Sequence, residues 1–317
     1  MKILVTGGCG YVGSVLVPRL LEAGHQIVVV DAQWFGNFLP KHNNLESINK
    51  MFYELIEDNL QSVEAVIHLA NVANDPSVEL NPVLSWEINV LHTTQLLNLC
   101  RKVKTIKKFM YASSGSVYGV KDEPRVTEDL DLVPISAYNK TKMSAERVSL
   151  SYAEDFAIYC IRPATVCGLS PRMRFDVVVN MFVMQAFKNG VITVLGGDQV
   201  RPNIHIEDMA RVYEHFLNNN GITSGAYNAG FENISVMSIA EMVAEKFNVS
   251  IEVKESNDPR SYRQDSSKLL ATGFIQTKYV SDAIEEISEA LLAGILEDND
   301  RWYTVSWMTA NKIGDLK

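Results

Sequence analysis

Three side chains of this sequence have the types and the spacing needed to move a proton to and from a hydroxyl group. Tyr138 and Lys142 stand four residues apart in ISAYNKTK, and Ser114 stands in the earlier segment YASSGSVYG. On a helix, positions i and i+4 share a face, so the Lys142 ammonium is expected about one turn from the Tyr138 phenol. A nearby cation favours the phenolate, and we therefore expect it to lower the pKa of Tyr138. Tyr138 could then take a proton from a hydroxyl that Ser114 holds by a hydrogen bond.

A tyrosine and a lysine at this spacing are common on helices, and taken alone they usually have no catalytic role. Their meaning depends on the elements around them. Ser114 follows the predicted strand KKFMYA, and Tyr138 opens a predicted helix over Tyr138–Ala153. The chemistry of the pair therefore depends on whether a partner for oxidation or reduction binds nearby.

A glycine-rich loop near the amino terminus predicts such a partner. TGGCGYVG follows the strand KILV and precedes a predicted helix, and it contains Gly7, Gly10 and Gly13 at GxxGxxG spacing. Glycines allow a tight turn, a close approach of the backbone to a pyrophosphate and tight packing of helix on strand. Asp31 ends the second predicted strand, where a carboxylate can accept hydrogen bonds from a ribose and repel a 2′-phosphate. The pattern favours NAD over NADP, although a glycine turn in a nucleotide-free α/β protein has the same letters.

The order of the predicted elements favours an α/β fold with a doubly wound parallel sheet. Unbroken apolar runs such as QIVVV, EAVIHL and AIYCIR are typical of strands buried on both faces, and helical patterns alternate with them. After Arg162 the pattern loosens and indicates a smaller mixed α/β lobe. Its predicted elements lie at Asp176–Asn189, VITVL, Ser238–Phe247, Ile251–Lys254 and Ser281–Leu296.

Composition excludes several classes of protein. The 317 residues carry a formal net charge of −9, which would repel a nucleic-acid backbone. No apolar run approaches the roughly 18 residues of a membrane span, and the first apolar stretch is too short for a secretory signal. The four cysteines show no CxxC pair and the six histidines no HExxH pattern. We expect a cytoplasmic protein without a metal ion.

Several motifs, in their order along almost the whole chain, resemble those of the extended short-chain dehydrogenase/reductases. The resemblance is to the branch of nucleotide-sugar epimerases, dehydratases and reductases. The matching segments are VTGGCGYVGS, VIHLAN, EINVLHT, SSGSVYG, YNKTK, IRPATVCG, RPNIHIEDMA and DPRSYRQD.

The resemblance implies a Rossmann domain that binds NAD and a lobe that binds a nucleotide-diphosphate sugar. The first would comprise residues 1–165 and about 203–229, and the second about 166–202 and 230–317. It implies Ser114, Tyr138 and Lys142 as catalytic residues. Residues implied to contact the cofactor, beside Tyr138 and Lys142, are Gly7, Gly10, Tyr11, Val12, Gly13, Asp31, Leu69, Ala70 and Asn89. Residues implied to contact the substrate are Thr165, Arg172, Asn180, Arg201 and Arg260.

The arginines also fit a diphosphate on physical grounds, because a guanidinium offers paired donors to phosphate oxygens. For any one of them, a solvated surface role is about as expected as ligand contact.

The sequence departs from the family pattern in three segments. Gly115 and Ser116 follow Ser114, where 4,6-dehydratases of the family have a pair of acids, and this disfavours dehydration. Asn49, Lys50 and Met51 stand where the third strand of the family has a Gly-Asp-hydrophobic element for adenine. Thr165 replaces an asparagine that is frequent in sugar epimerases.

The leading functional expectation is an NAD-dependent epimerase that transiently oxidises the C4 hydroxyl of a nucleotide sugar. A C4 dehydrogenase or 4-keto reductase would use the same residues, and the sequence does not separate the two. An unrelated alcohol dehydrogenase of the superfamily is weakened by the arginines. A non-catalytic NAD-binding protein would be expected to lose Tyr138 or Lys142. By the habit of the family, helices at Leu84–Arg101 and Tyr138–Ala153 would pair two copies as a four-helix bundle.

Overall fold

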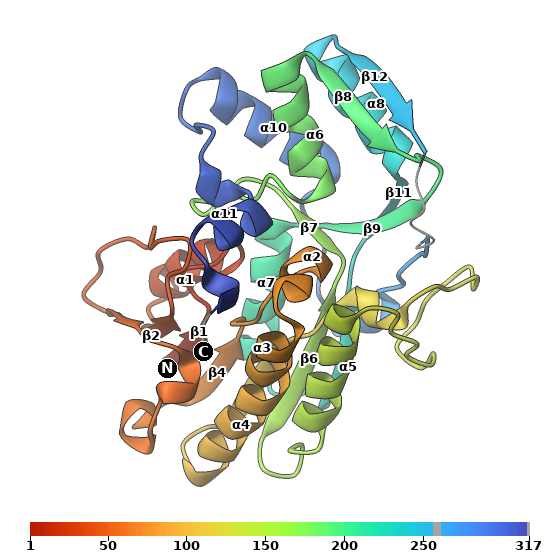
Figure 1. The fold of residues 1–317 in the computed structure, drawn as a ribbon. Helices are drawn as coiled ribbons and strands as arrows, with labels where there is room; N and C mark the ends of the chain where they lie inside the picture. The colour runs from red at the N-terminus through yellow and green to blue at the C-terminus, as the bar shows by residue number, and fades with distance from the viewer. Residues whose placement is uncertain (256–260, 316–317) are drawn as a thin grey trace.

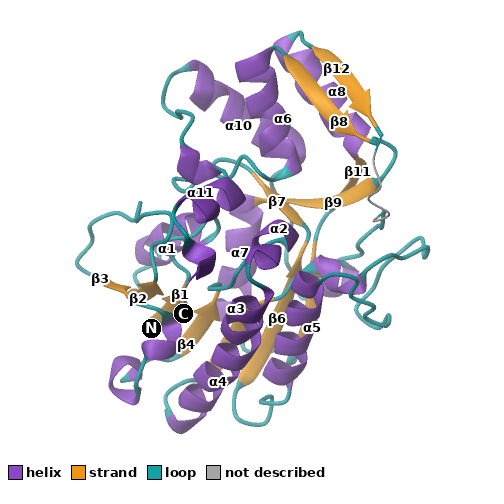
Figure 2. Ribbon diagram, viewed as in Figure 1, coloured by secondary structure: helices purple, strands orange, loops and turns teal. Residues whose placement is uncertain are grey.

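A computed structural model describes residues 1–255 and 261–315 of the chain. Its centre is a seven-stranded sheet in which every pair of neighbouring strands is parallel (Figures 1 and 2). The strands, in sheet order, are β10 (Gly225–Ala229), β6 (Ala157–Pro163), β5 (Lys108–Ala112), β4 (Ala65–His68), β1 (Lys2–Thr6), β2 (Gln26–Asp31) and β3 (Leu45–Asn49). The chain order reverses between β1 and β4, which is the switch point where ligands bind in such sheets. The predicted doubly wound fold is confirmed.

Helices cover both faces of this sheet and bury its apolar strands. On one face lie α1 (Gly13–Glu22) and α7 (Ile206–Asn218), whose Leu16 and Phe216 are fully buried. On the other face lie α2 (Asp75–Leu80), α3 (Pro82–Trp86), α4 (Thr93–Lys102) and α5 (Ala137–Leu150) (Figure 1). Burial of both sheet faces explains why the strand sequences are apolar without alternation.

The region predicted as one helix at Leu84–Arg101 is helical in the structure but is not a regular α-helix throughout. Its middle is a π-helical turn, η3 (Glu87–His92), between α3 and α4. Such turns insert a residue into the helix and are frequent near functional sites. Here the turn contains Asn89, whose side chain points into the protein and is fully buried.

The smaller lobe packs above the carboxyl ends of the central strands (Figure 1). It has a three-stranded sheet, β11-β9-β7, and a two-stranded sheet, β12-β8. Its strands are β7 (Thr165–Cys167), β8 (Val191–Leu195), β9 (Val200–His205), β11 (Glu232–Ser235) and β12 (Ser250–Lys254). Its helices are α6 (Val178–Asn189), α8 (Val236–Phe247) and α10 (Val280–Leu292), which share one apolar core.

Two short helices lie outside these groups. Helix α9 (Ser267–Leu270) lies beside β10, and α11 (Thr304–Ala310) lies between the two lobes near the carboxyl terminus. The remaining turns are the 3-10 segments η1 (Phe52–Glu54), η2 (Glu57–Leu60), η4 (Gly115–Tyr118), η5 (Asp300–Trp302) and η6 (Ile313–Asp315). Strand β10 belongs to the large sheet and β11 to the three-stranded sheet, and the division of the chain into two domains stays a prediction.

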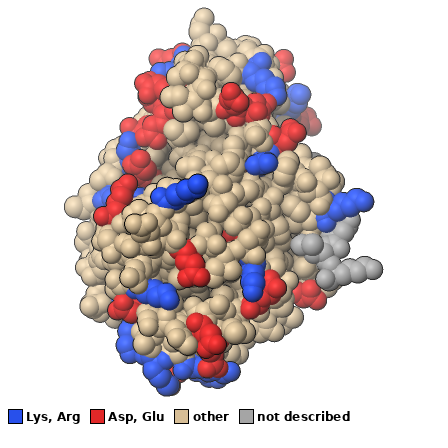
Figure 3. All heavy atoms as spheres, turned by 90° about the vertical axis from the view of Figure 1, so that its left-hand side faces the viewer, with Lys and Arg blue, Asp and Glu red and all other residues tan. Residues whose placement is uncertain are grey.

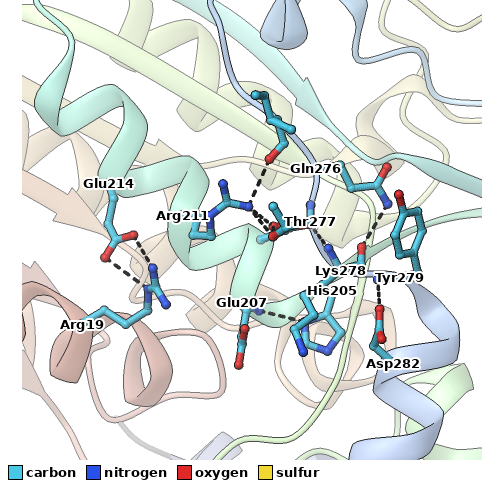
Figure 4. Close-up of polar contacts among 12 residues, drawn as sticks. Arg19, His205, Glu207, Arg211, Glu214, Gln276, Thr277, Lys278, Tyr279 and Asp282 are labelled. Atoms are coloured by element: carbon cyan, nitrogen blue, oxygen red, sulfur yellow. Dashed lines mark hydrogen bonds and ion pairs between the residues drawn. The ribbon is translucent and has the colours of Figure 1, made fainter.

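Polar contacts tie α7 to both of its neighbours (Figure 4). Asp208, in the first turn, accepts a hydrogen bond from the Thr277 backbone N–H at 2.9 Å and pairs with Arg211. Near the other end, Glu214 accepts two hydrogen bonds from Arg19 of α1, at 3.1 and 2.8 Å. These contacts hold α7 between α1 and the loop that leads into α10.

The surface carries charges of both signs. On the face shown in Figure 3, acidic and basic side chains are intermingled, and no extended basic area is visible there. Within residues 1–255 and 261–315, no helix has the length and the apolar character that crossing a membrane requires.

Candidate active site

A cavity of about 680 Å³ opens between the two lobes at the switch point of the large sheet. Its walls come from the glycine-rich loop, the ends of β2, β4 and β5, the start of α5, and the β7–α6 segment of the smaller lobe. The volume lies within the range of pockets that enclose small organic ligands. Residues far apart in the sequence therefore meet around one space.

The glycine-rich loop forms the floor of this cavity. Gly7 has φ +73°, and a Cβ there would lie 2.5 Å from the Ala70 backbone nitrogen. A Cβ at Gly13 would lie 2.6 Å from the Gly7 carbonyl oxygen, so helix and turn could not approach as they do. Gly7, Gly10, Tyr11, Val12 and Gly13 all line the cavity. This is the cradle that a pyrophosphate needs beside a helix N-terminus.

Asp31 lies where the ribose of a dinucleotide is expected. Its carboxylate accepts hydrogen bonds from the backbone N–H groups of Cys9 at 2.9 Å and Gln33 at 2.7 Å. Burial raises the pKa of Asp31, and these two hydrogen bonds oppose that effect. Asp31 therefore joins the glycine-rich loop to the segment after β2, in addition to its predicted contact with a ribose.

The adenine end of the cavity has an aromatic lining. Trp34, Phe35, Met51 and Phe52 line it, whereas Lys50 at the end of β3 is exposed. β3 ends at Asn49, so Asn49, Lys50 and Met51 lie at the end of the third strand. Apolar and aromatic side chains thus line this end of the cavity, and Lys50, at the position where the family pattern has an acid, does not.

Two of the predicted cofactor residues on the β4 side line the cavity and one does not. Leu69 and Ala70 form part of its wall. Asn89 lies behind that wall, where its side chain bonds to the N–H and the C=O of Val72, at 2.8 and 3.0 Å, and to the Thr141 hydroxyl. It therefore joins the β4 loop to α5 instead of facing the ligand space.

Tyr138 and Lys142 share one face of α5, as their spacing predicts, and both line the cavity with Ser114. The Lys142 Nζ donates to the Ala112 carbonyl at 2.7 Å and lies 5.8 Å from the centre of the Tyr138 ring. Ser136 caps the helix by accepting from the Asn139 N–H, which starts α5 one residue before Tyr138. The geometry brings the three predicted catalytic side chains together.

The expected effect of Lys142 on the phenol is wrong for this structure. Burial raises the pKa of Tyr138 to about 12, while a hydrogen bond with Ser114 and the charge of Arg174 act in the opposite direction. Burial also lowers the pKa of Lys142 to about 7. The sequence pattern does not reveal that both groups are removed from water, and desolvation outweighs a cation at this distance.

Arg174 is a site residue that sequence reasoning missed. It lines the cavity and forms a bidentate ion pair with Asp176, with both N–O distances at 2.9 Å. Asp176 also accepts a hydrogen bond from Asn74 of the β4–α2 loop at 3.2 Å. Asn74 has φ +74°, a backbone conformation that is unfavourable for residues other than glycine. Residues in such conformations are concentrated at functional sites. The two lobes thus meet beside Tyr138 through these three side chains.

The predicted substrate residues are divided between the cavity and its supports. Thr165, Arg172 and Arg201 line the cavity. Asn180 is fully buried beneath it, where its amide donates to the Tyr11 hydroxyl at 2.9 Å and accepts from the Gly168 N–H at 3.1 Å. Arg260 lies outside the described residues.

A side chain at the position after Ser114 would crowd its neighbours. A Cβ at Gly115 would lie 2.9 Å from the Gln264 side-chain oxygen and 3.1 Å from the Pro163 carbonyl oxygen. Gln264 is itself held by a 2.7 Å hydrogen bond to the Arg162 carbonyl. An acid at position 115 would therefore require this packing to change.

The comparison with known proteins agrees with this geometry. A family model described as "NAD dependent epimerase/dehydratase family" matches residues 3–230. The chain belongs to the NAD-dependent epimerase/dehydratase family. As the description of the family states, the cofactor is NAD, and the residues around the glycine-rich loop and Asp31 fit it.

Among relatives in this family, the chain is 27% identical over 289 residues to UDP-glucuronic acid decarboxylase 1 from Danio rerio. That match covers 84% of this chain and 66% of the relative, so the chain spans just under two thirds of the relative's length. A putative UDP-glucose 4-epimerase from Methanocaldococcus jannaschii is 32% identical over 224 residues, covering 68% of this chain and 73% of that one.

A solved structure from the family has a closely similar fold. The UDP-glucuronic acid 4-epimerase from Bacillus cereus, in complex with UDP-glucuronic acid and NAD, superimposes with a TM-score of 0.82 at 26% identity. The match covers 92% of this chain and 99% of that one. The names of these proteins state different reactions, decarboxylation for one and 4-epimerisation for the other two.

Proposed function

We propose that this chain is an NAD-dependent 4-epimerase of a nucleotide-diphosphate sugar, and that the sugar is a uronic acid. The observation that carries the proposal is the wall of the cavity around Tyr138. Tyr138 and Ser114 can together bind one hydroxyl group and move its proton. An acid at position 115, which dehydration would use, is absent and would crowd Gln264 and the Pro163 carbonyl. The names of the relatives, which include 4-epimerases, support the same reaction.

In the proposed mechanism, Ser114 and Tyr138 bind the C4 hydroxyl of the sugar. Tyr138, as the phenolate that the Ser114 hydrogen bond and the Arg174 charge favour, accepts the hydroxyl proton as the C4 carbon is oxidised, and the resulting phenol gives the proton back when the 4-keto group is reduced. The glycine-rich loop and Asp31 would hold NAD, which would supply the acceptor and then the donor of the C4 hydride. Ser114 keeps the oxygen in place in both steps, because its hydrogen bond can be made to a hydroxyl or to a carbonyl. Inversion requires the keto sugar to present its other face before reduction.

Arg174 is the residue that supports a uronic acid. It is a cation on the same wall as Tyr138, close enough for its charge to lower the pKa of that phenol. The Asp176 carboxylate accepts hydrogen bonds from Nε and Nη2 of Arg174, and no described residue accepts a hydrogen bond from its Nη1. A guanidinium with a remaining donor can bind a carboxylate on the sugar, and two of the relatives carry UDP-glucuronic acid in their names.

Replacing Arg174 by methionine is expected to raise KM for a nucleotide-linked uronic acid by about 10- to 100-fold, because a hydrogen bond to a charged group is lost. KM for the corresponding neutral hexose should change much less. Steady-state kinetics with UDP-glucuronic acid and UDP-glucose measure both values. Asp176→Asn is the matched control, since it keeps the cation and should retain the preference. Equal losses for the two sugars in Arg174→Met would contradict a carboxylate contact.

A nucleotide-sugar panel tests the reaction itself. The purified protein is incubated with UDP-, GDP-, dTDP- and CDP-sugars, with and without added NAD, while absorbance reports NADH and NMR reports the sugar. Inverted C4 stereochemistry without net NADH is the expected result. Stoichiometric NADH would instead support the C4 dehydrogenase or reductase, and loss of the carboxyl carbon would support decarboxylation.

We also propose a homodimer in which the continuous helix of α3, η3 and α4 pairs with α5 as a four-helix bundle. Val83 and Leu91, on the first two of these helical segments, are 69% and 57% exposed, which is consistent with an apolar face that a second copy covers. Size-exclusion chromatography with light scattering should give about twice the 35.4 kDa chain mass. A mass near 35 kDa at micromolar concentration would contradict the dimer.

A further inference from the structure

We propose that Arg172, although it comes from the segment after β7, binds the diphosphate of the cofactor and not that of the substrate. The segment reaches the cavity from the smaller lobe, yet the Arg172 side chain lies at the cofactor end, over the ring of Phe35 at 4.0 Å. Phe35 comes four residues after Asp31, the last residue of β2. Phe35, Asp31 and Arg172 all line the cavity. The side chain therefore stands beside the acid that marks the ribose.

The segment that carries Arg172 is attached to the start of α1. The Ser170 hydroxyl donates to the Tyr11 carbonyl at 2.8 Å and contacts the Ser14 hydroxyl at 2.9 Å. The Arg172 backbone N–H donates to the Ser14 hydroxyl at 3.4 Å. The backbone of Arg172 is thus fixed next to the helix N-terminus where a pyrophosphate binds.

The guanidinium itself has few partners. One Nη donates to the Met173 carbonyl at 3.4 Å and the other to the Thr304 hydroxyl at 3.3 Å. No described residue accepts from its Nε, which is buried, and no carboxylate of a described residue lies within 4 Å of the group. Arg172 is only 3% exposed.

A buried cation without a paired carboxylate is costly, and a bound anion would relieve the cost. Burial and the charge of Arg174 lower the pKa of Arg172 to about 9, which reflects the same cost. A diphosphate supplies the missing charge and accepts from a forked donor. Of the two diphosphates that the enzyme is proposed to bind, the one beside the glycine-rich loop is nearer to this side chain.

This role has a consequence for the reaction cycle. Thr304 and Met308 of α11 line the cavity, and Trp307 donates to the Trp34 carbonyl at 2.7 Å. Arg172, α11 and the segment after β2 therefore contact one another at the same part of the cavity wall. An enzyme that returns its hydride to the same sugar must keep its reduced cofactor, and a contact of this kind slows release.

Arg172→Met is expected to weaken ADP-ribose binding by about 10- to 100-fold and to leave UDP binding within about twofold, as measured by isothermal titration calorimetry. NAD retained by the purified protein should fall in parallel. Arg172→Lys keeps the charge but not the fork, and it should show a smaller loss for ADP-ribose alone. Arg19→Met is the matched control, because Arg19 makes a bidentate pair with Glu214 away from the cavity.

Three results would overturn the proposal. A loss of UDP affinity with ADP-ribose unaffected would assign Arg172 to the substrate. Equal losses for both ligands would show that the side chain supports the fold of the cavity. Full ADP-ribose affinity in the methionine variant would show no contact. If Arg172→Met does not fold, the lysine variant decides by the same three comparisons.

Discussion

Replacing Tyr138 by phenylalanine is expected to lower kcat by about 10²- to 10⁴-fold, the usual contribution of a positioned acid–base group. The ring would keep its packing, while the oxygen that exchanges a proton with the C4 hydroxyl would be absent. Because the reaction is proposed to pass through oxidation and reduction at one carbon, both half-reactions should be slowed. Initial rates at saturating nucleotide sugar measure the effect.

Tyr53→Phe is the control for this substitution. Tyr53 is 38% exposed and stacks on His92, outside the cavity. The Tyr53→Phe substitution also removes one phenol oxygen, and it should leave kcat unchanged. Calorimetry with NAD should show that Tyr138→Phe still binds the cofactor. Activity of that variant within a few-fold of the parent would rule out the proposed acid–base role.

Replacing Lys142 by methionine is expected to abolish most activity and to stabilise the protein without NAD. Lys142 is 3% exposed, and burial lowers its pKa from 10.5 to about 7. The folded protein thus binds this proton less tightly than the unfolded chain does, so the charge opposes folding. The penalty is complete below about pH 7 and disappears as the pH rises toward 10.5. Methionine is apolar and of similar length, which removes the penalty.

Thermal unfolding at several pH values checks this prediction. The melting temperature of Lys142→Met should exceed that of the parent by an amount on the order of 5 °C at pH 7. The difference should shrink as the pH approaches 10. Lys140→Met, at an exposed position on the same helix, should show no such pH-dependent gain. A gain that is equal at pH 7 and pH 10 would contradict a buried ammonium.

Backbone constraints made the cofactor half of the site predictable. At Gly7 and Gly13 one backbone segment approaches another too closely for a side chain, so glycine is required. Glycines at this fixed spacing can be recognised in the sequence. Asp31 could be located because it ends a strand whose apolar run is unmistakable. The position of Tyr138 relative to Lys142 follows from helix geometry alone.

Contacts between distant segments could not be predicted. Arg174 and Asp176 meet Asn74 across about 100 residues of sequence, and nothing in the local pattern around Asn74 indicates its left-handed backbone. The short helix α11 has a weak pattern, yet it covers the cofactor end of the cavity. The raised pKa of Tyr138 likewise depends on burial, which only the assembled fold determines.

The fate of the hydrogen on C4 tests the central claim most directly. The enzyme is incubated with UDP-glucuronic acid that carries deuterium at C4, and NMR and mass spectrometry follow the sugar. We expect the C4-inverted product to retain the deuterium at C4, because the hydride leaves and returns to the same carbon within one active site. Loss of the deuterium to free cofactor, or recovery of the label in a decarboxylated pentose, would contradict the proposed epimerase.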